Sequence, residues 1–411
     1  CGVFGYSQTS LYMYGNSAIS DNNASSNGGG CYGLYNIYME GDATINGNYA
    51  KNGGGIAFVT LIEFAKDCNA TIKDNSATLG GGIYVDGSEA CTYKNLTVTG
   101  NTADQGGGIY ISSDTTSSRP WIQIENCKIL SNIAKGSNSQ GAGIYNGEAD
   151  LSIRGGQLSQ NHSYGDGGGL FLKGTYSRVG LRKTETGGLY GSGYATEITG
   201  NVADNCGGAI YCSGNLEFNG IKIGSDSIAV TSSNYTNKAK FGGNLYLTSD
   251  GELALSGSNV ICQGYATQDG GSIYLASSKN IGYCGSGYGG AGIIISGYAE
   301  NNGGGLYVTS AVKLTVSGTG HIEITVVQST AGASGGGIYA KGSFNSLYLI
   351  VNNNTAKSGG GICAESDLTI NSSEITINNN TATEYGGGIY AASSGKLEMN
   401  AGTISGNTAT T

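Results

Sequence analysis

Ten cysteines and two histidines are the side chains of this 411-residue chain best suited to metal or redox chemistry. No two cysteines have the Cys-x-x-Cys spacing, and the closest pair, Cys206 and Cys212, lies on either side of a Gly-Gly turn. His162 and His321 add no spacing from which a zinc site could be built. The sequence therefore predicts no metal site and no cofactor.

The cysteines are better explained as structural residues, either disulfide-bonded or buried as thiols. Their even number hints at an oxidising compartment. Cys68 with Cys91, and Cys262 with Cys284, are about one repeat apart and could form disulfides.

A row of aromatic residues is the most regular chemical feature of the chain. Each ring follows a glycine block and an aliphatic residue, and in an alternating strand it points away from the core. Stacked rings would stabilise one another by roughly 0.5 to 1.5 kcal/mol per pair. They could equally form a binding strip for sugar rings or partner proteins. Together with Tyr32, the row comprises Tyr84, Tyr110, Tyr145, Phe171, Tyr211, Tyr246, Tyr274, Tyr307, Tyr339 and Tyr390.

Catalysis on a polysaccharide would require carboxylates, or carboxylates with a basic partner, on neighbouring repeats. The next outward position of each repeat places no two carboxylates side by side. Lys341 and Glu365 fall on consecutive repeats and are expected to form a weak surface ion pair. The sequence therefore predicts no catalytic residue.

A repeat positions the aromatic row. The block Gly-Gly-x-aliphatic-aromatic recurs, as at Gly80–Tyr84 (GGGIY) and Gly207–Tyr211 (GGAIY). The aliphatic position of the block, occupied by cysteine in the first copy, falls at 31, 56, 83, 109, 144, 170, 210, 245, 273, 306, 338, 362 and 389. Seven of the twelve intervals are 24 to 28 residues long, and the other five carry insertions.

Each minimal unit contains three short alternating segments bounded by Gly, Ser or Asn, such as the unit from Gly386 to Thr411. Helical repeats would need longer stretches of 3.6-residue periodicity. The pattern predicts an all-β fold: a right-handed single-stranded parallel β-helix (solenoid) of about thirteen turns, with three short strands per turn. We expect one domain spanning residues 1–411.

A second mark, Asn-x-Ala, precedes many glycine blocks, for example at Asn75, Asn101 and Asn380. Asparagine tolerates the left-handed conformation and can hydrogen-bond along a stack, whereas glycine permits positive φ without a Cβ clash. Both are therefore expected at the corners of the solenoid.

These two marks resemble the repeats of the chlamydial polymorphic outer membrane proteins and of similar β-helix adhesin-like proteins, whose motifs are GGA followed by an aliphatic residue, and FxxN. Gly207 to Ile210 matches the first motif in every letter. The second matches loosely, since Ile72, Val98 and Ile404 stand where the family has phenylalanine. The resemblance implies a parallel β-helix and an adhesive surface role.

Two insertions are expected to be loops that could carry specificity. Residues 112–122 contain Arg119, the only proline and the only tryptophan, Trp121. Residues 173–196 contain Arg178 and Arg182 among several tyrosines. Each could equally be a tolerated insertion.

Composition restricts the partners. The net charge is −9 and there is no basic run, so nucleic acid is not expected as a partner. No apolar stretch approaches the roughly 18 residues that a membrane span needs, so we expect no membrane insertion by this segment.

The sequence thus predicts a non-catalytic extracellular or cell-surface protein, adhesin-like or structural, that contacts glycans or host or cell-surface proteins. One alternative is a subunit that self-associates end to end into an extracellular filament. Another is a polysaccharide-active β-helix enzyme, a lyase or a hydrolase.

Overall fold

The computed structural model describes residues 1–6, 8–86, 89–112, 120–173, 176–180, 196–225, 228, 231–276, 281–283, 291–309, 312–315, 322–345, 348–392 and 395–411. Within these ranges every regular element is a β-strand. None of the described segments forms a helix with the length and hydropathy needed to cross a membrane. The chain separates into two compact units, Cys1–Asp204 (unit 1) and Asn205–Thr411 (unit 2).

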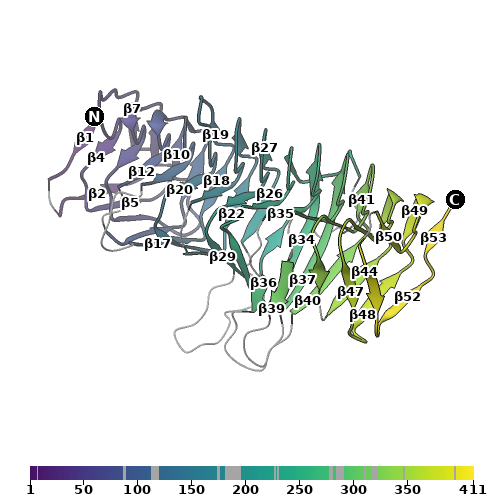
Figure 1. Cartoon of the computed structure of the whole chain (residues 1–411). Helices are drawn as coiled ribbons and strands as arrows, with labels where there is room; N and C mark the ends of the chain where they lie inside the picture. The colour runs from purple at the N-terminus through teal and green to yellow at the C-terminus, as the bar shows by residue number, and fades with distance from the viewer. Residues whose placement is uncertain are drawn as a thin grey trace. The chain divides into compact units, whose positions relative to one another are not determined.

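Unit 1 is a parallel β-solenoid whose strands stack on three sides (Figure 1). The first side comprises β1 (Val3–Phe4), β4 (Cys31–Tyr32), β8 (Ile56–Ala57), β12 (Ile83–Val85), β16 (Ile109–Ile111), β20 (Ile144–Asn146) and β24 (Leu170–Leu172). The second side comprises β2 (Ser10–Met13), β5 (Asn36–Met39), β9 (Leu61–Phe64), β13 (Cys91–Lys94), β17 (Trp121–Glu125), β21 (Asp150–Arg154) and β25 (Tyr176–Gly180).

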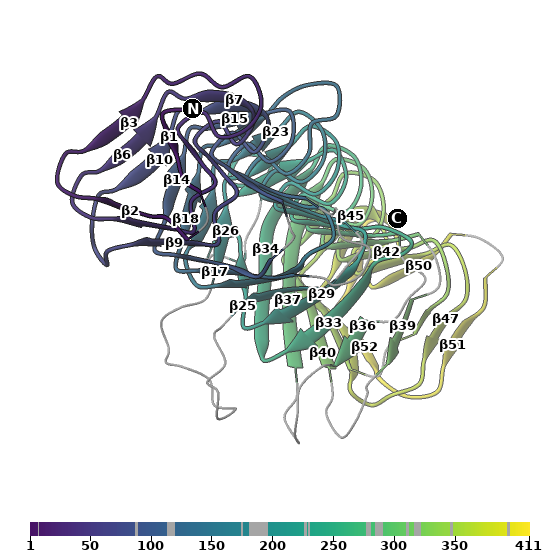
Figure 2. The same cartoon turned by 90° about the vertical axis from the view of Figure 1, so that its left-hand side faces the viewer.

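The third side of unit 1 carries two short strands in most turns, and Figure 2 shows β3, β6, β10, β14 and β18 following one another along it. Its strands are β3 (Ala18–Ser20), β6 (Thr44–Asn46), β7 (Tyr49–Asn52), β10 (Thr71–Lys73), β11 (Ser76–Leu79), β14 (Thr97–Thr99), β15 (Thr102–Ala103), β18 (Lys128–Leu130), β19 (Ile133–Ala134), β22 (Gln157–Ser159), β23 (His162–Ser163), β26 (Glu197–Thr199) and β27 (Val202–Ala203).

Unit 2 repeats this arrangement. Its first side comprises β28 (Ile210–Cys212), β32 (Leu245–Leu247), β35 (Ile273–Leu275), β38 (Leu306–Val308), β42 (Ile338–Ala340), β46 (Ile362–Ala364) and β50 (Ile389–Ala391). The second side comprises β29 (Asn215–Asn219), β33 (Glu252–Ser256), β36 (Ile281–Tyr283), β39 (Val312–Thr315), β43 (Phe344–Asn345), β47 (Leu368–Ile370) and β51 (Leu397–Met399).

The third side of unit 2 contains two strands that run through its corner without a break, β34 and β37. Its strands are β30 (Lys222–Ile223), β31 (Asn237–Ala239), β34 (Ser258–Ala266), β37 (Ala291–Ala299), β40 (Ile322–Val327), β41 (Thr330–Ala331), β44 (Leu349–Asn352), β45 (Thr355–Ser358), β48 (Ile375–Asn378), β49 (Thr381–Tyr385), β52 (Thr403–Ser405) and β53 (Thr408–Ala409).

Alternation along each strand builds the core. In β12 and β16 the isoleucines and valine are buried while the tyrosine between them is only half-buried. Ile83 pairs with Ile109, and Ile109 with Ile144, so one aliphatic residue stacks on another along the interior. Each such side chain is almost completely buried, which is worth roughly 1.5 to 3 kcal/mol.

A column of asparagines occupies the corner that divides the third side of unit 1. Asn101 is fully buried, and its Oδ1 accepts hydrogen bonds from both the backbone N–H and the Nδ2 of Asn75, each at 3.0 Å. Its own Nδ2 donates to Oδ1 of Asn132 and to the carbonyl of Ile72, each at 3.0 Å. Because both polar atoms of the side chain are hydrogen-bonded, burying the amide leaves no polar atom without a partner and avoids that energetic cost.

The same side-chain bond links each asparagine to the next along unit 1. The column runs through Asn22, Asn48, Asn75, Asn101, Asn132, Asn161 and Asn201. In unit 2 an equivalent column links Asn354, Asn380 and Asn407.

The all-β parallel solenoid is therefore confirmed, and the asparagine marks lie at a corner as predicted. Seven first-side strands delimit six complete turns in each unit, close to the thirteen turns expected for the chain. The expected three strands per turn understates the third side, because the asparagine corner divides it into two short strands. The single-domain organisation stays a prediction.

The suggested disulfide between Cys68 and Cys91 is wrong, because both residues carry free thiols. Cys91 lies on β13 and is buried, whereas Cys68 lies in the connection that follows β9. Burial raises the pKa of the Cys91 thiol to about 12. Cys262 also carries a free thiol, and its suggested partner Cys284 lies outside the described residues.

Candidate functional site: the outer aromatic column

The glycine corner fixes where each first-side strand begins. Gly106 has φ +62°, a conformation that L side chains rarely adopt. A Cβ on Gly107 would lie 2.5 Å from the carbonyl oxygen of Ile133 in the adjoining turn, so the close approach requires glycine there. With the corner fixed, the aromatic residue of each strand falls in register with that of the next: Tyr84 pairs with Tyr110, and Tyr110 with Tyr145.

In unit 1 these rings form an almost parallel stack on the outer face of the first side. Ring centroids lie 5.5 Å apart for Tyr84 and Tyr110, and the two planes differ by 7°. The centroids of Tyr110 and Tyr145 are 4.6 Å apart, and those of Tyr145 and Phe171 are 5.2 Å apart, with planes within 5°. We call this row and its counterpart in unit 2 the aromatic column.

The aromatic column contains a residue that the repeat pattern did not identify. Where the block reads GGGIA, Ala57 pairs with both Tyr32 and Tyr84 and supplies no ring. The next residue, Phe58, has φ +58°, and its ring centroid lies 5.4 Å from those of Tyr32 and Tyr84. Phe4 extends the column on the other side of Tyr32. The only sequence signal was an aromatic residue one position late.

In unit 2 the column repeats the stacking. The ring centroids are 5.5 Å apart for Tyr211 and Tyr246, 4.9 Å for Tyr246 and Tyr274, 4.7 Å for Tyr274 and Tyr307, and 5.0 Å for Tyr307 and Tyr339.

Cys363 then occupies the aromatic position in unit 2. It is buried in a cluster with Tyr307 and Tyr339, against which Tyr390 also packs. Burial raises the pKa of this thiol to about 11, so it is protonated at neutral pH.

From Tyr84 to Phe171, and from Tyr211 to Tyr339, near-parallel stacking covers the faces of the rings. Tyr145 is only 6% exposed, and Phe171, Tyr307 and Tyr339 are similarly buried. Burial raises the pKa of Tyr110 and of Tyr145 above the ordinary tyrosine value. A partner would therefore meet ring edges and neutral hydroxyls rather than flat ring faces. This geometry accounts for the column as a stabilising stack, and binding by it stays a prediction.

Two of the four loop candidates lie in the described residues. Trp121 begins β17 and is 38% exposed. Arg178 lies on β25, where its guanidinium sits 5.3 Å from the ring centroid of Tyr176 and its Nη2 donates to the Tyr176 hydroxyl at 3.1 Å. Arg119 and Arg182 lie outside the described residues, as do most positions of both insertions.

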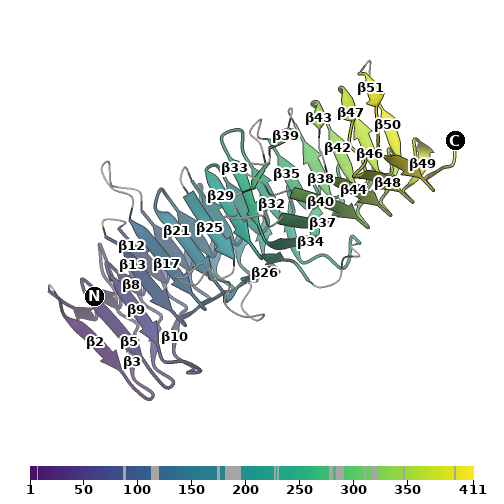
Figure 3. The same ribbon diagram turned by 90° about the horizontal axis from the view of Figure 1, so that it is seen from below.

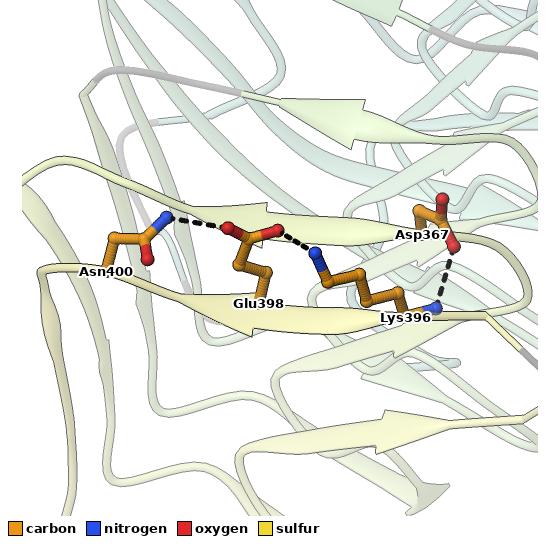
Figure 4. Close-up of polar contacts among 4 residues, drawn as sticks. All are labelled: Asp367, Lys396, Glu398 and Asn400. Atoms are coloured by element: carbon orange, nitrogen blue, oxygen red, sulfur yellow. Dashed lines mark hydrogen bonds and ion pairs between the residues drawn. The ribbon is translucent and has the colours of Figure 1, made fainter.

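Charged residues on the outer faces form local pairs. The Tyr339 hydroxyl donates to the carboxylate of Glu365, and burial followed by this bond raises the pKa of Tyr339. Lys396 and Glu398 pair on the outside of unit 2, where Asn400 donates to Glu398 at 3.1 Å and the Lys396 N–H donates to Asp367 at 2.7 Å (Figure 4). Lys396 and Glu398 are well exposed, so this network contributes little to stability.

Within the described residues, no group of three or more His, Cys, Asp or Glu side chains is placed to hold a metal ion.

The repeating turns, the buried asparagine column and the stacked outer rings together define a solenoid repeat protein. Four segments match the model of the Chlamydia polymorphic membrane protein repeat: residues 95–112, 195–213, 348–365 and 374–392. The chain thus carries repeats of this type. No curated protein and no solved structure matches it significantly.

Each matched segment covers the same part of a turn. In residues 95–112 it runs from β14 through the Asn101 corner and the glycine corner into β16. Residues 348–365 cover the equivalent stretch from β44 to β46. The match therefore lies on the third side, the two corners and the aromatic strand, and it leaves out the second-side strands.

Proposed function

We propose that this chain is a non-catalytic, adhesin-like protein of the cell surface that contacts glycans or proteins through the sides of its solenoid. The observation that carries the proposal is the presence of four polymorphic membrane protein repeats in a chain built from stacked parallel turns. The name of that repeat family refers to membrane proteins, which supports a cell-surface location.

The physical character of the solenoid supports this role. Each side presents an outward residue from every turn at a spacing of about 4.8 Å, so a long partner can contact many turns at once. Buried asparagines and stacked rings hold the backbone of these sides in place. A rigid surface loses little conformational entropy on binding, which favours extended, multipoint contact.

A cell-binding assay tests the proposal. Fluorescently labelled chain is incubated with epithelial cells, and bound label is measured against increasing concentrations of unlabelled chain. We expect saturable binding that the unlabelled chain displaces. The same chain is incubated with a panel of polysaccharides, and the products are separated by size. Failure to bind any cell surface, or release of shortened saccharides with turnover, would contradict the proposal.

A further inference from the structure

A groove in unit 1 follows the edge between the second and third sides, away from the aromatic column. It consists of two adjoining hollows of about 870 and about 350 Å³. The two hollows share Ala65, Lys66 and Asn95, so they are continuous. Figure 3 shows the second-side strands β2, β5, β9, β13, β17 and β21 side by side along this face.

Strand register aligns one outward residue from each of six successive turns along the groove, a row that we call the groove column. Pairing links Tyr12 to Tyr38, then to Glu63, Lys94, Glu125 and Arg154. Five spacings of about 4.8 Å make this column about 24 Å long. It can therefore contact several units of a chain-like ligand.

Exposed aromatic rings form one end of the groove. Tyr12 and Tyr14 are 56% and 62% exposed, in contrast to buried rings of the aromatic column such as Tyr145 at 6%. Tyr12 stacks on Tyr38 with centroids 4.9 Å apart, and Tyr14 lies beside it at 6.4 Å. These rings offer an apolar surface with hydroxyls at its margin, which suits the apolar face of a sugar ring.

Basic side chains line the larger hollow. Lys66, Lys94, Lys128 and Arg154 supply four positive charges there against the two negative charges of Asp67 and Glu125, so the larger hollow has a net charge of +2 in a chain of −9, while the smaller hollow adds the negative charges of Glu40 and Glu63. Arg154 lies 3.8 Å from Glu125. Lys66, Lys94 and Lys128 form no ion pair with any residue that the structure describes, so their ammonium groups are available to an anionic ligand.

The alternation of charge restricts the kind of ligand. Glu63 and Glu125 flank Lys94 in the groove column, so an unbroken line of phosphates would meet repulsion at every second turn. Asn95 and Asn126 add amides for hydroxyl groups. The strands β5, β9, β13, β17 and β21 pair with neighbours on both sides and offer no free edge to a peptide, whereas β2 at the end of the groove pairs with β5 alone.

We propose that this groove binds an anionic oligosaccharide, with sugar rings on Tyr12 and Tyr14 and carboxylate or sulfate groups on Lys66, Lys94 and Lys128. The inference rests on the proposed function, since it names the ligand class and the site through which the surface protein contacts glycans. Separated anionic groups between neutral hydroxyls match the alternating groove column.

Calorimetric titration tests the inference on the whole chain. The probes are oligogalacturonates, chondroitin sulfate oligosaccharides, neutral malto-oligosaccharides of equal length and an acidic peptide of equal charge. We expect at least one anionic saccharide to bind about tenfold or more tightly than the neutral ones, and more weakly as salt is raised. Whichever anionic saccharide binds tighter identifies the acidic group.

Groove variants locate the site. The double variants Lys94→Ala with Lys128→Ala, and Tyr12→Ala with Tyr14→Ala, should each weaken binding by about tenfold or more. The control Lys51→Ala with Lys135→Ala removes the same charge outside the groove and should leave affinity unchanged. Thermal unfolding of each variant checks that the fold is intact.

Equal affinity for neutral saccharides, binding of the acidic peptide alone, or binding that the groove variants leave unchanged would overturn the inference. Cell binding that persists unchanged in both groove variants would overturn the groove site while leaving the proposed function standing. Absence of cell binding by the unmodified chain would remove both.

Discussion

The aromatic column and the groove column both run along the outside of unit 1 with one residue per turn, yet their chemistry differs. In the aromatic column nearly every turn contributes the same kind of side chain, and each ring covers its neighbours until Tyr145 is 6% exposed. The groove column changes from tyrosine to alternating charges, and Lys94 forms no ion pair with any described residue. The side chains of the uniform column pack against one another, whereas the irregular column leaves a charged group without an ion-pair partner among the described residues.

The repeat match follows the same division. Its four segments cover the corners and the aromatic strand, where neighbouring turns need like residues. The six second-side strands that supply the groove column, β2, β5, β9, β13, β17 and β21, lie outside all four segments. The repeat match therefore describes the corners and the aromatic strand of a turn, and the strands of the groove column lie outside it.

The largest effect is expected in the buried asparagine column, which consists of one residue type and is therefore the most uniform of the columns. Asn101→Ala removes the acceptor for two N–H groups of Asn75 and the donor for Ile72 and Asn132. Since each buried polar group left unbonded costs about 1 to 3 kcal/mol, we expect a loss of about 3 kcal/mol or more in the free energy of unfolding. Denaturant titration followed by circular dichroism measures it.

An exposed asparagine provides the matched control. Asn69→Ala removes one surface hydrogen bond, from Asn69 to Asp42, and should change the free energy of unfolding by no more than about 0.5 kcal/mol. Equal effects of the two substitutions would show that the buried column does not stabilise the solenoid.

A middle-sized effect is expected from the aromatic column. Tyr110→Ala removes a half-buried ring that stacks on Tyr84 and Tyr145, and should lower the free energy of unfolding by about 2 kcal/mol. Tyr49→Ala is the control, since Tyr49 is 50% exposed, and its effect should be near zero.

Saccharide affinity distinguishes the two outer columns. Neither Tyr110→Ala nor Tyr49→Ala should change the calorimetric affinity for the anionic probe. A loss of affinity in Tyr110→Ala with an unchanged free energy of unfolding would reverse the roles assigned to the aromatic and groove columns.

The sequence was sufficient to predict the solenoid and the aromatic column because both depend on spacing. Glycine is required at Gly106, where the backbone bends, and at Gly107, where two turns of the solenoid approach closely. The glycine block therefore recurs once per turn and marks each turn in the sequence. The pattern did not predict Phe58 as a member of the aromatic column, because Phe58 reaches the column from the position after Ala57. It does so through a left-handed backbone conformation that the pattern does not encode.

The groove column could not be predicted in the same way. Its residues precede the corner on the second side, and loops of unequal length separate them from the glycine blocks. Only the pairing of Glu63 with Lys94 and of Lys94 with Glu125 establishes which residues are neighbours. The disulfide between Cys68 and Cys91 failed for a related reason, since spacing of about one repeat does not bring two side chains face to face.

The smallest expected effect is the dependence of stability on alkaline pH. Burial raises the pKa of Tyr110, Tyr307 and Tyr339 above the ordinary tyrosine value, and their neighbours raise it further. The unfolded chain therefore loses these protons at a lower pH than the folded chain does. The contribution of the three tyrosines to the free energy of unfolding is complete below about pH 10 and decreases as the pH rises from there towards the folded-state pKa values. Tyrosinate absorbance is measured against pH for the folded chain and for the chain in denaturant. The Tyr110→Phe variant shows which part of the ionisation delayed to higher pH belongs to Tyr110. Identical titration curves in the two states would mean that the rings are not covered, and the contrast with the exposed tyrosines of the groove would lose its basis.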